Sequence, residues 1–86
     1  MTQSMNQEII LYGKKDCHLC EDAKAVLKEL QGEFDFTIKE LDIYEDDRLL
    51  ERYQVMIPVV EIDGEEVDFG QISEHLIRNR LHQKNA

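Results

Sequence analysis

The alternation of two hydrophobic periodicities along the chain restricts its fold more than any other feature. A short apolar run typical of a buried strand covers residues 8–12 and ends at Gly13. Apolar residues then recur at helical spacing, namely Leu19, Ala23, Val26, Leu27 and Leu30. Residues 35–43 return to strand-like alternation, after Gly32 as the expected helix C-cap. A strand, a helix and a strand in this order predict two parallel strands joined by a right-handed crossover.

The second half of the chain predicts a helix, a hairpin and a last helix. Residues 44–53 open with acids, as helix N-termini favour, and bury one side through Leu49, Leu50 and Tyr53. Asp63-Gly64 is a strong hairpin signal between two apolar strands that carry Val59, Val60, Ile62, Val67 and Phe69. Residues 71–82 hold the i, i+4 pairs Ile72/Leu76 and Ile77/Leu81.

These elements together predict one α/β domain over residues 1–86, with an ordered core at about residues 8–82. The order is β-α-β-α-β-β-α. The first two strands should be parallel and the last two antiparallel, which makes a four-stranded mixed sheet flanked by helices.

Composition narrows the classes of function. The 86 residues are 42% hydrophobic and carry a net charge of −9, which argues against binding to nucleic acid or to an anionic membrane surface. The N-terminal stretch "MTQSMNQE" lacks the basic and apolar regions of a signal peptide, and no apolar run approaches the roughly 18 residues of a membrane span. We therefore expect a cytoplasmic monomer.

Both cysteines lie in the stretch "KKDCHLCEDAK", after the first strand and at the start of the first helix. In open α/β sheets, chemistry tends to lie in this crevice beyond the carboxyl end of a strand. A permanent structural disulfide is improbable, because cytosolic thiols are kept reduced and so short a loop removes little unfolded-state entropy. A C-x-x-C motif near a β-α-β pattern favours a redox couple.

A position at the helix start has a chemical consequence for Cys17. Unpaired N–H groups and the positive end of the helix dipole stabilise a thiolate, and such motifs bring cysteine pKa values to about 3.5–7.5. Lys14 and Lys15 add positive charge, as a protonated His18 would, whereas the nearby acids Asp16, Glu21 and Asp22 oppose the shift. Cys20 returns to the same side one turn on. We therefore predict that Cys17 attacks a substrate disulfide and that Cys20 resolves the mixed disulfide.

Metal binding is the main chemical alternative to redox exchange. A structural zinc site needs four ligands at characteristic spacing, and His18, His75 and His82 are not spaced as partners of the cysteines. We therefore expect no metal within one chain. An iron–sulfur cluster shared by two chains stays open, because two copies would supply four thiolates.

Pro58 is the only proline and precedes the third strand. One interpretation is a trans proline that begins a strand. The other is a cis Ile57–Pro58 bond facing the cysteines, with backbone groups of Ile57 free to pair with an incoming chain.

The stretches "LYGKKDCHLCEDAKAVL" and "VMIPVVEIDG", with the element order, resemble the glutaredoxin branch of the thioredoxin superfamily. They are most similar to its small glutaredoxin-like proteins with a C-H-L-C motif, over about residues 8–81. The resemblance implies a nucleophilic Cys17, a resolving Cys20, a supporting Lys14 and a cis peptide bond before Pro58.

The chain departs from the glutaredoxin pattern where glutathione would bind. His18-Leu19 replaces the usual Pro-Tyr between the cysteines, and Met56-Ile57 replaces Thr-Val before the proline. Phe69 and a single Gly70 stand where glutaredoxins carry Gly-Gly, so Phe69 should crowd that site. These departures argue against glutathione recognition but leave dithiol chemistry in place.

We therefore predict a dithiol–disulfide oxidoreductase that reduces protein or low-molecular-weight disulfides. No tightly bound cofactor is expected. Glutathione or another low-molecular-weight thiol, within a thiol reductant system, is the candidate electron donor. The alternative from another class is a non-enzymatic redox switch or partner-binding module, including an iron–sulfur half-site.

Overall fold

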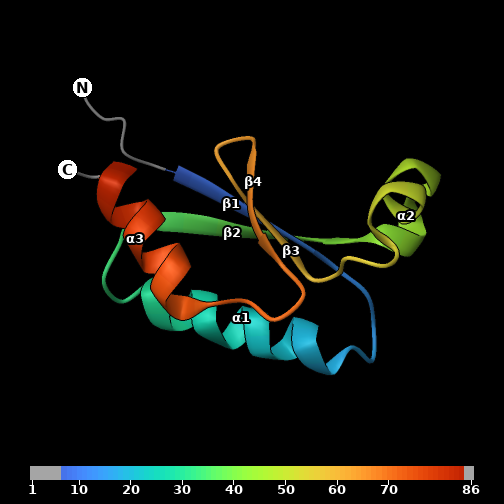
Figure 1. Ribbon diagram of the computed structural model, residues 1–86, viewed down its shortest axis with the longest axis horizontal. Coiled ribbons are helices and arrows are strands. Elements are labelled where there is room, and N and C mark those ends of the chain that lie inside the picture. Colours follow the sequence, from blue (N-terminus) through green and yellow to red (C-terminus); the bar gives the residue numbers. More distant parts are fainter. Residues whose placement is uncertain (1–6, 85–86) are drawn as a thin grey trace.

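The computed structural model describes residues 7–84, and its elements follow the expected β-α-β-α-β-β-α order (Figure 1). A short 3-10 helix, η1, separates the second strand from the second α-helix. The bounds are β1 Gln7–Gly13, α1 His18–Leu30, β2 Phe36–Asp42, η1 Ile43–Glu45, α2 Asp47–Tyr53, β3 Val59–Ile62, β4 Glu65–Phe69 and α3 Glu74–Lys84. Within these residues no helix is long and apolar enough to cross a bilayer.

The four strands form one mixed sheet in the order β2-β1-β3-β4. β1 runs parallel to β2, with Gly13 opposite Asp42 at the end of the ladder. β3 is antiparallel to both β1 and β4, and Tyr12 lies opposite Val59. The predicted α/β class, with its parallel first pair and antiparallel hairpin, is confirmed. This topology brings the carboxyl ends of β1 and β2 to one edge, where α1 begins.

One face of the sheet is covered by α1 and α3, which contact one another but are not parallel (Figure 1). Side chains from both helices and all but the last strand form an aliphatic cluster there, which also holds the one buried phenylalanine. Its buried members are Ile9, Leu11, Ala23, Leu27, Leu30, Phe36, Val60, Ile62, Ile77 and Leu81. The periodic apolar positions of the sequence therefore account for most of this core.

The opposite face is covered at one end by η1 and α2 and has a smaller core of Tyr12, Ile43, Tyr53 and Val59. The Tyr12 and Tyr53 rings pack with centroids 4.6 Å apart. Tyr12 Oη donates to Glu61 at 2.9 Å, and Tyr53 Oη donates to Glu66 at 2.6 Å. Two phenol–carboxylate pairs thus attach α2 and the end of β1 to the hairpin.

Helix boundaries in the second half differ from the expected ones because polar side chains cap the backbone. Asp42 accepts the N–H of Tyr44 and Asp46 accepts that of Arg48, both at 2.9 Å, so residues 44–53 divide into η1 and α2. Ser73 Oγ accepts the N–H of Leu76 at 3.2 Å, and the last helix therefore begins at Glu74, not at Gln71.

Two expectations about α1 and one about α3 are wrong. Gly32 is not a left-handed C-cap: Gln31 ends the helix with φ −62°, and Gly32 N–H bonds to Glu29 O in a tightened turn. Leu19, expected on the buried face, is 44% exposed. Its neighbour Cys20 takes the inward position of the first turn instead. Leu76 of α3 is similarly exposed, although Ile77 beside it is fully buried.

Candidate active site

Cys17 is the N-cap residue of α1. Its backbone is extended, with φ −113° and ψ 109°, and its Sγ accepts the N–H of Cys20 at 3.2 Å. Its carbonyl accepts the N–H of Glu21 at 3.1 Å, the first bond of the helix. Carboxylate and hydroxyl oxygens of Asp46 and Ser73 cap α2 and α3, whereas a sulfur takes that position in α1. An N–H directed at Sγ favours the thiolate over the thiol.

Cys20 lies on the first turn of α1 and is joined to Cys17 by a disulfide. The two Cα atoms are 5.1 Å apart, within the usual range for a disulfide, so the bridge fits the backbone conformation at the start of the helix. Cys17 is half-buried, whereas Cys20 is 9% exposed. The two sulfurs are therefore bonded to one another at the start of one helix, and Cys17 is the more exposed of the two residues.

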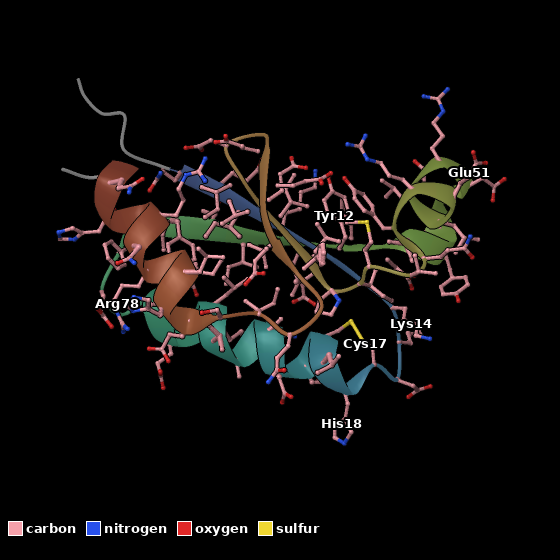
Figure 2. All side chains as sticks on the ribbon, viewed as in Figure 1. Tyr12, Lys14, Cys17, His18, Glu51 and Arg78 are labelled. Atoms are coloured by element: carbon pink, nitrogen blue, oxygen red, sulfur yellow. A yellow bond between two sulfur atoms is a disulfide. The ribbon has the colours of Figure 1, made fainter. Side chains whose placement is uncertain are left out.

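Charged and polar side chains surround Cys17 on the solvent side. Lys14 lies on the loop before it, and His18 points away from the sheet (Figure 2). Lys14, Asp16, His18 and Leu19 are all exposed. Asp16 has φ +54°, a left-handed conformation that Asp tolerates better than most residues and that turns the chain into the helix.

A cavity of about 290 Å³ lies beside Cys20, between α1 and the ends of β1 and β2. Its lining contains both positively and negatively charged side chains, including Lys14, Lys15 and Glu21. Lys24 Nζ, also in the lining, forms an ion pair with Glu40 at 3.1 Å. We did not single out the β2 residues of this lining from sequence. The end of β2 lies near the cysteines because the parallel register places Asp42 beside Gly13.

The loop before β3 lies at the same edge of the sheet. The Ile57–Pro58 peptide bond is cis. Tyr12 pairs with Val59, and continuing this antiparallel register by one residue brings Pro58 beside Gly13. Ile57 N–H already donates to Tyr53 O at 3.1 Å. Backbone pairing with an incoming chain would therefore have to use the Ile57 carbonyl, not both of its polar groups as expected.

Gly70 joins the end of β4 to this loop. Its N–H lies 2.8 Å from Pro58 O and 3.1 Å from Met56 O, and its φ of +72° suits glycine. Phe69 beside it is 53% exposed. Asp68 accepts the N–H of Ser73 at 2.8 Å, so its carboxylate is used at the start of α3. Gly70 and the exposed Phe69 thus adjoin the Pro58 loop, whereas the Pro58 side chain itself is fully buried.

His75 and His82 lie on α3 and are exposed. The His82 ring packs edge-on against Phe34, and His75 Nε2 lies 3.3 Å from Asn79 Nδ2. Among residues 7–84, no three His, Cys, Asp or Glu side chains are gathered as a metal-binding group.

Residues 8–82 match the sequence profile of a glutaredoxin-like domain family (DUF836). Among curated proteins, none matches the sequence significantly.

Two solved structures of similar fold match almost the whole chain. Protein Ne2328 from Nitrosomonas europaea, solved by NMR, is 25% identical over 94% of this chain and 98% of its own, with a TM-score of 0.81. Target protein XcR50 from X. campestris is 26% identical over 87% and 96%, with a TM-score of 0.72.

A mutant thioredoxin from Halobacterium salinarum NRC-1 shares the fold, with a TM-score of 0.68 at 20% identity over 91% of this chain and 74% of that one. Because the C-x-x-C pair lies at the start of α1 in a chain that matches the glutaredoxin-like profile, the site supports a role related to thiol redox chemistry. The profile covers nearly the whole described chain, and the chain therefore belongs to the glutaredoxin-like domain family (DUF836).

Proposed function

We propose that the protein is a thiol–disulfide oxidoreductase in which Cys17 is the nucleophile and Cys20 the resolving cysteine. One observation supports this most directly: Cys17 Sγ is at the N-cap of α1, accepts a backbone N–H and is bonded to Cys20. The difference in exposure supports the order of the two roles. A substrate sulfur approaches the half-buried Cys17 more easily than Cys20, which is 9% exposed.

Each turn of the proposed reaction is a pair of exchanges. Cys17 thiolate attacks one sulfur of the substrate disulfide, a Cys17–substrate bond forms, and the other substrate sulfur leaves as a thiolate that takes a proton from solvent. Cys20 then loses its proton to solvent and attacks Cys17 Sγ. The Cys17–Cys20 disulfide forms and the second substrate thiolate leaves. Two electrons have passed to the substrate, and two external thiols must return them.

The surrounding residues have proposed supporting roles. Lys14 supplies positive charge beside the thiolate, and His18 and Leu19, exposed between the cysteines, meet the substrate. Ile57, Phe69 and Gly70 are the proposed substrate-binding residues, and the buried Pro58 would hold their loop in place. The partners are a disulfide-containing protein or a low-molecular-weight disulfide and a thiol reductant system. We propose that the protein acts as a cytoplasmic monomer, without nucleic acid or membrane.

The test is to equilibrate the protein with glutathione and with thioredoxin buffers and to follow the Cys17–Cys20 pair by thiol labelling. A pair that cycles with either pool supports the proposal, and a pair that exchanges with neither contradicts it. In an assay of substrate disulfide reduction, Cys17→Ser should abolish turnover, whereas Cys20→Ser should accumulate mixed disulfides at Cys17. Alkylation of the reduced protein should give Cys17 a pKa below about 8.5, the value of a free cysteine.

Glutathione dependence needs a separate measurement. Phe69 adjoins the Pro58 loop at 53% exposure, where a second glycine would let a ligand approach the backbone. We propose that Phe69→Gly increases turnover with glutathione and leaves turnover with a small dithiol unchanged. An equal effect on both reductants would show that Phe69 does not select between them.

A further inference from the structure

We propose that Gly13 is a positioning residue for the resolving cysteine, and that its missing side chain makes room for the oxidised form of Cys20. This inference rests on the proposed function. Gly13 is the last residue of β1, and it is buried. A Cβ atom built on Gly13 would lie 3.0 Å from Cys20 Sγ and 3.4 Å from Cys20 Cβ.

Backbone conformation does not explain the glycine at this position. The glycines with left-handed φ are Gly64 and Gly70, whereas Gly13 continues the strand conformation of β1. A glycine in a strand weakens it and often marks a place where another group approaches the backbone closely. Here the approaching group is a sulfur of the redox pair. The 3.0 Å separation is shorter than the roughly 3.5–4.0 Å optimum between carbon atoms, and sulfur is larger than carbon.

Neither side of this contact can retreat easily while the disulfide is present. Gly13 is held in the ladder opposite Asp42, and the preceding residue, Tyr12, is opposite the fully buried Val59. Cys20 lies on the first turn of α1, and its sulfur is bonded to Cys17. A methyl group on residue 13 would therefore press on a sulfur that cannot rotate away.

The reduced form is different, because the Cys20 thiol is no longer bonded to Cys17 and can rotate about its Cα–Cβ bond to another staggered rotamer. An added methyl group should therefore disfavour the disulfide more than the dithiol. It should also slow the step in which Cys20 attacks Cys17 Sγ, because that step must bring the sulfur to the position against residue 13. Attack by Cys17 on the substrate does not use this position.

The test compares Gly13→Ala with Gly32→Ala, a control at a glycine that also has no left-handed φ and whose added Cβ would meet Glu29 O, not a cysteine. Equilibration in the buffer with which the wild type exchanges, glutathione or thioredoxin, should show at least a tenfold shift of Gly13→Ala toward the dithiol, which is about 30 mV for a two-electron couple. Gly32→Ala should match the wild type. An unshifted Gly13→Ala in a wild-type background that cycles normally would overturn this inference alone. A wild type that exchanges with neither glutathione nor thioredoxin would instead defeat the proposed function.

Rates separate positioning from a general structural effect. With a small aromatic disulfide as substrate, Gly13→Ala should form the mixed disulfide at Cys17 at the wild-type rate and release the second thiol at least tenfold more slowly. Equal slowing of both steps would overturn the proposal. So would an equal loss of thermal stability in the oxidised and reduced proteins.

A variant that fails to fold is also informative. If Gly13→Ala does not fold, the added methyl should be tolerated once the sulfur is removed, so the double variant Gly13→Ala/Cys20→Ala should be as stable as Cys20→Ala. A double variant that is still unfolded would show that glycine serves only the strand, and would overturn the proposal.

Discussion

The two faces of the sheet are stabilised in different ways. The face under α1 and α3 buries ten residues, nine of them aliphatic, with no polar group among them. The face under α2 buries four residues, and two of these are tyrosines whose hydroxyls donate to Glu61 and Glu66. Apolar burial is non-directional, whereas a phenol–carboxylate bond fixes two particular atoms.

The cysteine pair lies beside the carboxyl end of β1, where residues from both faces of the sheet meet. Cys20 enters from α1 on the aliphatic face, and Tyr12 is anchored on the other, one residue before Gly13. The Gly13 backbone, against which the Cys20 sulfur packs, therefore lies between these two contacts. We therefore expect the aliphatic face to contribute more to the free energy of unfolding, and the tyrosine face to fix the position of β1 and α2 against the hairpin.

The largest loss of stability is expected when apolar volume is removed under α1. Leu27→Ala should destabilise the protein by about 2–5 kcal/mol, because Leu27 is fully buried and its truncation leaves a cavity. The measurement is urea unfolding with an unchanged m-value. Leu19→Ala is the matched control on the same helix, and at 44% exposure it should change stability by about 0.5 kcal/mol or less. Similar losses at both positions would contradict the assignment of this core.

A smaller effect should follow on the tyrosine face. Tyr53→Phe keeps the ring beside Tyr12 and removes the hydroxyl that donates to Glu66, so a loss of about 1–2 kcal/mol is expected. Tyr44→Phe is the control, since Tyr44 is 60% exposed. If both variants unfold at the same urea concentration, the phenol–carboxylate bond contributes nothing to stability.

The same face should make the protein sensitive to alkali. Burial, and then the hydrogen bond to Glu61, raises the pKa of Tyr12 to about 12. Since the folded value exceeds the ordinary value of 10.0, this contribution to stability is complete below pH 10 and is lost as the pH rises through about 12. Ultraviolet titration of tyrosinate should show a late component that shrinks in Tyr12→Phe. A variant with the full late component would refute this.

The smallest effect is expected at an exposed ion pair that links the end of α1 to α3. The Arg78 guanidinium bonds to Glu33 at 2.6 Å and lowers the pKa of that carboxyl below its ordinary value of 4.5. This contribution is present above pH 4.5 and declines as the pH falls through the lowered value. An NMR titration should find a higher Glu33 pKa in Arg78→Gln than in the wild type. Equal values would remove this contact from the account.

Particular residues show where prediction from sequence succeeded. The Asp63-Gly64 hairpin and the buried positions Leu27 and Leu30 are present as expected, because they follow from local turn chemistry and periodicity. The parallel β1–β2 pair is also present, because it follows from the order of strand, helix and strand. Cys17 lies at the start of the helix for the same local reason. Leu19 and Gly32 were misjudged, since their surroundings depend on which neighbour turns inward and on how the chain leaves the helix.

The order of elements, the helical and strand periods and the position of the cysteine pair were determined by the sequence, because each depends on residues near one another in the chain. Three contacts were decided by the tertiary structure alone. The Cys20 sulfur packs against Gly13, the Ile57 N–H donates to Tyr53 O, and the Gly70 N–H donates to Pro58 O. These contacts depend on strand register and on the fit between elements, and small differences in packing distance set them without leaving a periodic signal in the sequence.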